Sequence, residues 1–206
     1  MNHTLEDFEI TQECIQKEAE LQCNSLHLLQ DTKENSIIEA KQLLIDGATD
    51  SYSSQFAHTA KINLHKGKLR CHKADIDTLD GGEVHATEVS IKNALSGHIY
   101  AQDVTIDFAG EDVTVIASNS ITVHNVPSTN NTFLIDYTQV PILLSKLELI
   151  ENDIKQLTKE LDDAKRHNHS IVPSLEAKII LLEKDKFAIV NSSKTATIQL
   201  NTTTNI

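Results

Sequence analysis

Histidine is the residue type in this chain with the most obvious capacity for chemistry. The chain has 206 residues, of which 10 are His. His58 and His72 stand at equivalent positions of a repeat described below, and His167 and His169 share a polar stretch. A metal site needs three or four ligands, usually with carboxylate or thiolate help. Each of these groups supplies two, so we predict exposed side chains, no metal ion and no cofactor.

Acidic residues form a second candidate group. One position of the repeat, directly after an apolar residue, holds Asp46, Asn63, Asp77, Lys92, Asp107 and His124. In stacked strands these residues would form a ladder, in which Lys92 separates Asp77 from Asp107 and relieves like-charge stacking. The ladder fits either an acidic docking stripe or an ordinary solvated face. We take Asp77, Asp107, His167 and His169 as the candidate partner-docking residues.

Motifs that carry catalysis are absent from the sequence. It contains no P-loop, no G-x-G-x-x-G, no G-x-S-x-G and no H-E-x-x-H. Paired carboxylates on a solenoid can hydrolyse polysaccharides, but this chain has short turns and only 4% aromatic residues. We predict that the protein is not an enzyme, and we keep a solenoid enzyme acting on carbohydrate, or an acyltransferase, as an alternative.

Composition narrows the classes of partner. The formal net charge of −12 argues against binding to nucleic acid or to anionic lipid, which require a basic surface. The N-terminal residues lack the features of a signal peptide, and no apolar stretch is long enough to span a membrane. The odd number of cysteines, 3, suits a reducing compartment. We expect a soluble cytoplasmic protein with protein partners.

A short internal repeat determines the predicted fold. A small residue is followed by apolar residues three and five positions later, as in Ala101, Val104 and Ile106. The small residues of successive repeats are Cys23, Ala40, Ala57, Cys71, Ala86, Ala101 and Ala117. The steps between them are 17, 17, 14, 15, 15 and 16 residues. Helical repeats need about 33 to 47 residues, so these units are coils of short strands.

Side-chain alternation gives the geometry of each coil. Residues two apart in a strand point the same way, so Val104 and Ile106 face inward together. The step of three from Ala101 to Val104 breaks the alternation and requires a bend at Gln102-Asp103. Coils of this kind bury a continuous core only when they stack, and parallel crossovers are right-handed by default. We therefore predict a mainly β protein built as a right-handed parallel β-solenoid.

The pattern changes after the solenoid. Apolar residues at heptad spacing occupy Leu143, Leu147, Ile150, Ile154, Leu157, Leu161 and Ala164. Arg166 to Ser170 has the composition of a turn, and Leu175, Ile179 and Leu182 form the stripe of a second helix. The sequence therefore predicts an antiparallel α-helical coiled-coil hairpin. The hairpin either folds back on itself or lies against the solenoid, or it projects and pairs with a partner helix or another copy.

Strands are expected again after the hairpin. Phe187 to Val190 and Thr195 to Leu200 both have strand-like composition, and the second resembles a coil of the repeat. The hairpin is then an insertion, and the chain returns to cap the solenoid. The predicted boundaries are 1–17 for an N-terminal cap or irregular segment, 18–136 for the solenoid, 137–187 for the hairpin, and 188–206 for the returning strand and a frayed tail.

The segment HIYAQDVTIDFAGEDVTVIASNSITVHNV, followed by the heptads, resembles the flagellar assembly protein A family of bacteria. The resemblance covers roughly residues 37 to 200 and implies a scaffold role in flagellar assembly or polar localisation, with no catalytic residues. Bactofilins, which are self-polymerising β-solenoids, are a second resemblance without such a hairpin. The predicted function is a non-enzymatic scaffold that binds partners, or itself, through the hairpin or the solenoid ends.

Overall fold

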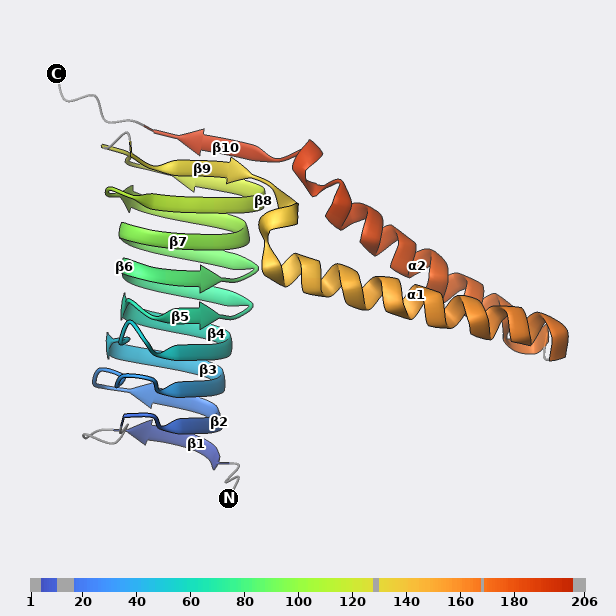
Figure 1. The fold of residues 1–206 in the computed structure, drawn as a ribbon, viewed down its shortest axis with the longest axis horizontal. Coiled ribbons are helices and arrows are strands. Elements are labelled where there is room, and N and C mark those ends of the chain that lie inside the picture. The colour runs from blue at the N-terminus through green and yellow to red at the C-terminus, as the bar shows by residue number, and fades with distance from the viewer. Residues whose placement is uncertain (1–4, 11–16, 128–129, 168, 202–206) are drawn as a thin grey trace.

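The body of the molecule is a parallel β-solenoid over residues 20–135, with a pair of packed helices at its C-terminal end (Figure 1). The computed structural model describes residues 5–10, 17–127, 130–167 and 169–201. About seven turns stack along the axis, as the repeat predicts. The right-handed crossover stays a prediction of general chain chirality.

The strands follow the chain from one end of the solenoid to the other. They are β1 (Leu5–Ile10), β2 (Glu20–Leu28), β3 (Ile37–Ala48), β4 (Ser54–His65), β5 (Lys68–Arg70), β6 (Lys73–His85), β7 (Glu88–Ala109), β8 (Val113–Val123), β9 (Thr132–Ile135) and β10 (Thr197–Leu200). From β1 to β8 each strand pairs in parallel with the next. β9 and β10 both pair with β8, and β4 also pairs with β6.

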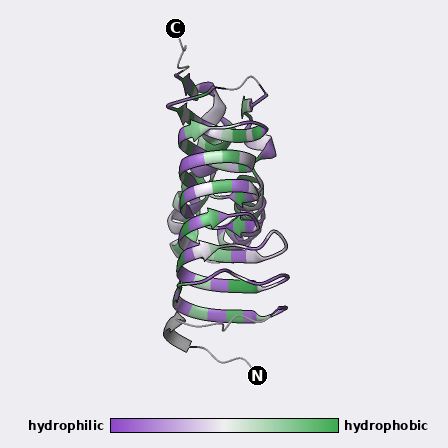
Figure 2. Ribbon diagram, turned by 90° about the vertical axis from the view of Figure 1, so that its left-hand side faces the viewer, coloured by the Kyte–Doolittle hydropathy of each residue, from purple (hydrophilic) through white to green (hydrophobic). Residues whose placement is uncertain are grey.

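The register places equivalent residues of the repeat directly above one another. Ile62 pairs with Ile76 and Ile76 with Ile91, and all three are buried. Figure 2 shows the resulting alternation of hydrophobic and hydrophilic residues along the coils. The interior is therefore a set of continuous apolar rows, and burial of these rows across coils supplies the main stabilisation.

Small residues line one interior corner, as the repeat predicts. Ala101 pairs with Ala117, and both have no exposed surface. The step from Ala101 to Val104 pairs with the longer step from Ala117 to Ile121, so the register shifts by one residue at this corner. Burial raises the pKa of the Cys71 thiol at this corner to about 12, so Cys71 is a protonated core residue rather than a nucleophile.

A glycine is required where one turn passes close to the next. Gly97 has φ +125°, and a Cβ there would lie 2.6 Å from the carbonyl oxygen of Gly82. Any other residue would combine an unfavourable backbone conformation with a clash against backbone. This turn is therefore fixed by backbone packing as well as by its polar composition.

The N-terminal part of the solenoid has a buried polar corner. His65 is fully buried, and its Nδ1 lies 2.9 Å from the hydroxyl of Thr49. The Thr49 hydroxyl also accepts hydrogen bonds from the backbone of Lys66 and Gly67. Desolvation lowers the pKa of His65 to about 4, so the imidazole is neutral at pH 7 and its hydrogen bonds hold two turns together.

Both ends of the chain contribute coils. The register of β1 sets Leu5 opposite Cys23 and Phe8 opposite Leu26, which extends the repeat into the segment that the sequence predicted only as a cap or irregular. β10 returns to the solenoid as predicted, with Ile198 opposite Ile121. The predicted fraying of the tail after Asn201 concerns residues outside the described part.

Two helices form the hairpin. They are α1 (Pro141–His167) and α2 (Val172–Val190), and a short 3-10 helix, η2 (His169–Ile171), joins them. Ion pairs from Lys186 to Glu151 (2.8 Å) and from Lys165 to Glu176 (3.4 Å) flank the seam. The helices therefore pack in the antiparallel arrangement expected from the short connection.

The predicted strand at Phe187 to Val190 is wrong, because these residues are the last turn of α2. Leu175, Leu182 and Ile189 continue at intervals of seven, and Ile189 is buried against α1 and the base of the hairpin. Tertiary packing of this heptad stripe overrides the strand preference of a short β-branched run. The hairpin therefore extends beyond the predicted boundary at residue 187.

The base of the hairpin packs against the solenoid. A small cluster there contains Ile116 from β8 together with Val140 and Leu143, and Tyr100 packs at its edge. Beyond this cluster the helices point away from the coils (Figure 1). The helices thus fold back on each other and project from the solenoid, while pairing with a partner helix stays a prediction.

Candidate docking surfaces

The predicted ladder exists as an outward row on one face of the solenoid. Lys92 Nζ lies 2.6 Å from Asp77 Oδ1, and the pKa of Lys92 is raised, first by that hydrogen bond and then by the charges around it, Asp107 included. The row is therefore internally compensated at its centre. Its three carboxylates are separated by Asn63 and Lys92.

The candidate histidines lie elsewhere. His167 ends α1 and His169 begins η2, so both lie at the tip of the hairpin and both are exposed. Figure 1 shows this tip at the far end of the helices from the coils that hold Asp77 and Asp107. The predicted docking residues therefore lie at two separate places. Asp77 and Asp107 are on the solenoid, and His167 and His169 are at the tip of the hairpin.

The predicted histidine ladder is present. The rings of His58 and His72 stack with centroids 5.1 Å apart and an interplanar angle of 9°. In the part of the chain that the structure describes, no group of three or more His, Cys, Asp or Glu side chains is arranged to hold a metal ion. The stacked pair is an exposed feature of the coil spacing.

A second ladder was missed in the sequence. His85 stacks on Tyr100, with centroids 4.9 Å apart, and its Nε2 lies 2.6 Å from Glu83 Oε1. The pKa of Glu83 is lowered, chiefly by this hydrogen bond and further by Lys68 at 3.8 Å. The signal was available, since Arg70, His85 and Tyr100 occupy one position of successive repeats. Tyr100 also packs against the cluster at the base of the hairpin, so this ladder supports the part of the solenoid to which the helices are attached.

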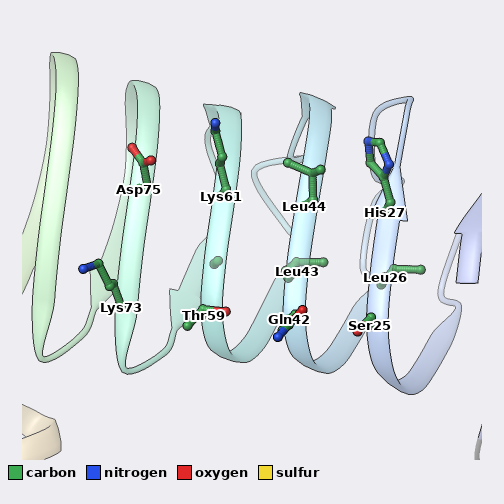
Figure 3. Close-up of a pocket in the computed structure, with 11 residues that line it drawn as sticks. Ser25, Leu26, His27, Gln42, Leu43, Leu44, Thr59, Lys61, Lys73 and Asp75 are labelled. Atoms are coloured by element: carbon green, nitrogen blue, oxygen red, sulfur yellow. The ribbon is translucent and has the colours of Figure 1, made fainter. Parts of the chain in front are cut away.

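A shallow groove runs along the outer face of the N-terminal coils (Figure 3). Register places His27, Leu44, Lys61 and Asp75 in one row. Ser25, Gln42, Thr59 and Lys73 form the other row. Asp75 is the one carboxylate among the lining residues. A glycosidase needs two carboxyl groups facing one bond, so this groove lacks the arrangement that the carbohydrate-enzyme alternative requires.

The outer face of α2 is the most unusual surface of the molecule. Ile180, Leu181 and Phe187 are 69%, 59% and 68% exposed, and Ala177 and Ala188 lie exposed beside them. A helix that is apolar on both sides is normally covered on both, and large exposed apolar side chains on one face mark an interaction site. The signal in the sequence was the spacing of Ala177, Ile180 and Phe187, which the inner heptad stripe obscured.

Comparison with known proteins assigns the chain to no family. No protein-family model, no curated protein and no solved structure matches the chain. Among the described residues, neither α1 nor α2 has the length and apolar character that crossing a membrane requires.

Proposed function

We propose that this protein is a non-enzymatic scaffold, in which the solenoid is a rigid mount and the hairpin is the arm that binds protein. The single observation that carries the proposal is the exposed apolar face of α2, with Ile180, Leu181 and Phe187 at its centre. The function thus resides in a surface held at a distance from the coils.

Rigidity of the mount supports the proposal. The base of α1 is preceded by η1 (Tyr137–Gln139), where Asp136 accepts hydrogen bonds from Thr138 and Gln139. The side-chain hydrogen bonds from Thr138 and Gln139 are the main reasons why the pKa of Asp136 is lowered. The cap and the cluster around Ile116 fix the direction in which the hairpin leaves the solenoid.

The experiment compares immobilised full-length chains in their capacity to retain protein. Phe187→Glu is expected to reduce retention at least tenfold, because it places a charge in the centre of the apolar face. Tyr52→Glu is the matched control, since Tyr52 is 72% exposed on a solenoid turn. Equal retention by both variants would move the binding surface from the hairpin to the solenoid and contradict the proposal.

The cellular setting is a further part of the proposal. The coil repeat followed by a heptad hairpin supports bacterial flagellar assembly or polar localisation, through the resemblance described above.

End-to-end self-assembly is a second candidate, favoured by the last coil. Ile198 and Leu200 of β10 are 43% and 41% exposed, although their register partners Ile121 and Val123 are interior residues. Within the described residues, β9 and β10 pair only with β8. An open strand edge can template another chain, so light scattering that grows without limit with concentration would support this candidate.

A further inference from the structure

The outer face of α2 has the spacing of a second coiled-coil seam. Ala177, Ile180, Lys184 and Phe187 follow one another at intervals of 3, 4 and 3 residues. They lie on the side of α2 away from Leu182 and Ile189, which pack in the cluster with α1, and away from the buried Leu175. In heptad terms Ala177 and Lys184 are a positions, and Ile180 and Phe187 are d positions.

Charges beside this seam select the direction of a partner that is identical to α2. Glu183 occupies the g position directly before Lys184. In an antiparallel pair, g positions face each other and Glu183 would meet its own copy. In a parallel pair, the a position packs against the preceding g position of the other helix, so Lys184 of each chain meets Glu183 of the other. The parallel pair thus gains two reciprocal ion pairs, which offset the approach of the two Lys184 side chains at their shared a layer.

Lys184 also fixes how many helices associate. A single polar residue at an a position specifies register and a two-stranded state, at a cost in stability. Its aliphatic stem can cover apolar surface while the ammonium reaches the carboxylate at the edge. Leu181 at the e position then packs beside Ile180 of the other copy.

The size of the seam sets the strength of the contact. α2 has 19 residues and is about 28 Å long, so its outer seam offers about two heptads. Such a contact falls below the roughly 800 Å² per partner of a standard stable interface. The association is therefore reversible and depends on concentration.

We infer that two copies of this chain associate through their α2 helices, packed in parallel on their outer faces about a twofold axis. This inference rests on the proposed function of the hairpin as the binding arm and names a second copy as the occupant. The two hairpins then form a four-helix assembly that holds two solenoids at one end.

Sedimentation velocity on the full-length chain from about 5 to 500 μM tests the association. The wild-type mass is expected to rise from monomer to a plateau at dimer. Phe187→Glu should weaken dimerisation at least tenfold, whereas Leu149→Glu, at an equally exposed position of α1 (65%), should leave it unchanged. Lys184→Glu should also weaken it, and adding Glu183→Lys should restore it. Circular dichroism confirms that each variant is folded.

Cysteine cross-linking tests the direction. Ala177→Cys is expected to form a disulfide-linked dimer on mild oxidation, beyond any product of the wild-type chain treated in the same way. Cross-linking only in a mixture of Ala177→Cys and Phe187→Cys would show antiparallel packing and overturn the inference.

The remaining outcomes separate the two proposals. A wild-type chain that stays monomeric throughout, or a mass that grows without a plateau, would overturn the inference. If a monomeric wild-type chain still retains protein and Phe187→Glu does not, the scaffold proposal stands and the second copy is not the occupant.

Discussion

Polar side chains buried in the solenoid have a defined role at the scale of single residues. Thr32, Ser53 and Gln55 are buried near the turns, and the hydroxyl of Ser53 accepts hydrogen bonds from both Thr32 and Gln55. Such groups cost free energy unless they are hydrogen-bonded. The bond from Thr32 joins neighbouring coils at a corner, and the bond from Gln55 lies within one coil. His65 is the titratable member of this corner.

We predict that acid destabilises the protein through His65. Its pKa is about 4 in the folded chain, against an ordinary value of 6.5 for an exposed histidine, so the unfolded chain binds a proton first. Buried, neutral His65 therefore contributes fully to the free energy of unfolding above pH 6.5, and this contribution is lost as the pH falls toward 4. The free energy of unfolding should decline by up to about 1.4 kcal/mol per pH unit in that window.

Urea titrations at pH 7, 6 and 5 measure this decline. His65→Gln removes the titrating group and should flatten the pH dependence between 6.5 and 5, whatever its effect on stability at pH 7. A variant that retains the full wild-type slope would assign the acid sensitivity to other groups.

At the scale of elements, the hairpin and the solenoid depend on different interactions. The coils are held by parallel pairing and apolar rows, whereas the helices are held by one seam and a small basal cluster. Most of the stability of helices in proteins comes from tertiary packing, so the hairpin depends on its seam.

Two neighbouring residues of α1 therefore differ sharply in their expected effect. Ile150→Ala removes a buried side chain of the seam and should cost about 2 to 5 kcal/mol, which melts the hairpin before the coils. Leu149→Ala, on the exposed side, should change stability by less than about 0.5 kcal/mol. Thermal melts followed at 222 nm check both, and equal shifts would contradict the assigned faces.

Predictability also differs between elements. The coils could be predicted because Ala101, Val104 and Ile106 recur with their spacing intact, and each recurrence repeats the same physical requirement. The end of α2 could not, because Phe187 to Val190 has strand-like composition and only contact with α1 reveals Ile189 as a seam residue. The outer face of α2 was missed because exposure is a property of the assembled hairpin. The ladder of His85 and Tyr100 follows from the repeat register and could have been predicted, whereas the ion pair of His85 with Glu83 depends on side-chain conformation.

At the scale of the whole molecule, stability should vary along the axis. An inner coil has a neighbour on both sides, whereas an end coil has one, so opening begins at the ends. We predict that amide hydrogen exchange is slowest in β6 and β7 and faster in β2 and β10. Mass spectrometry of exchanged peptides measures this gradient, and uniform protection along the axis would indicate a single cooperative unit instead.

The strict register has a consequence for how such a chain can change in evolution. Because His85 lies opposite Tyr100 and Ala101 opposite Ala117, the residues between two equivalent positions form a closed unit. Duplication or loss of one unit leaves every interior row continuous and moves the hairpin along the axis by one strand spacing, about 4.8 Å. A gene of this kind can therefore lengthen or shorten its product in whole coils, and so alter the reach of its binding arm without redesigning any core contact.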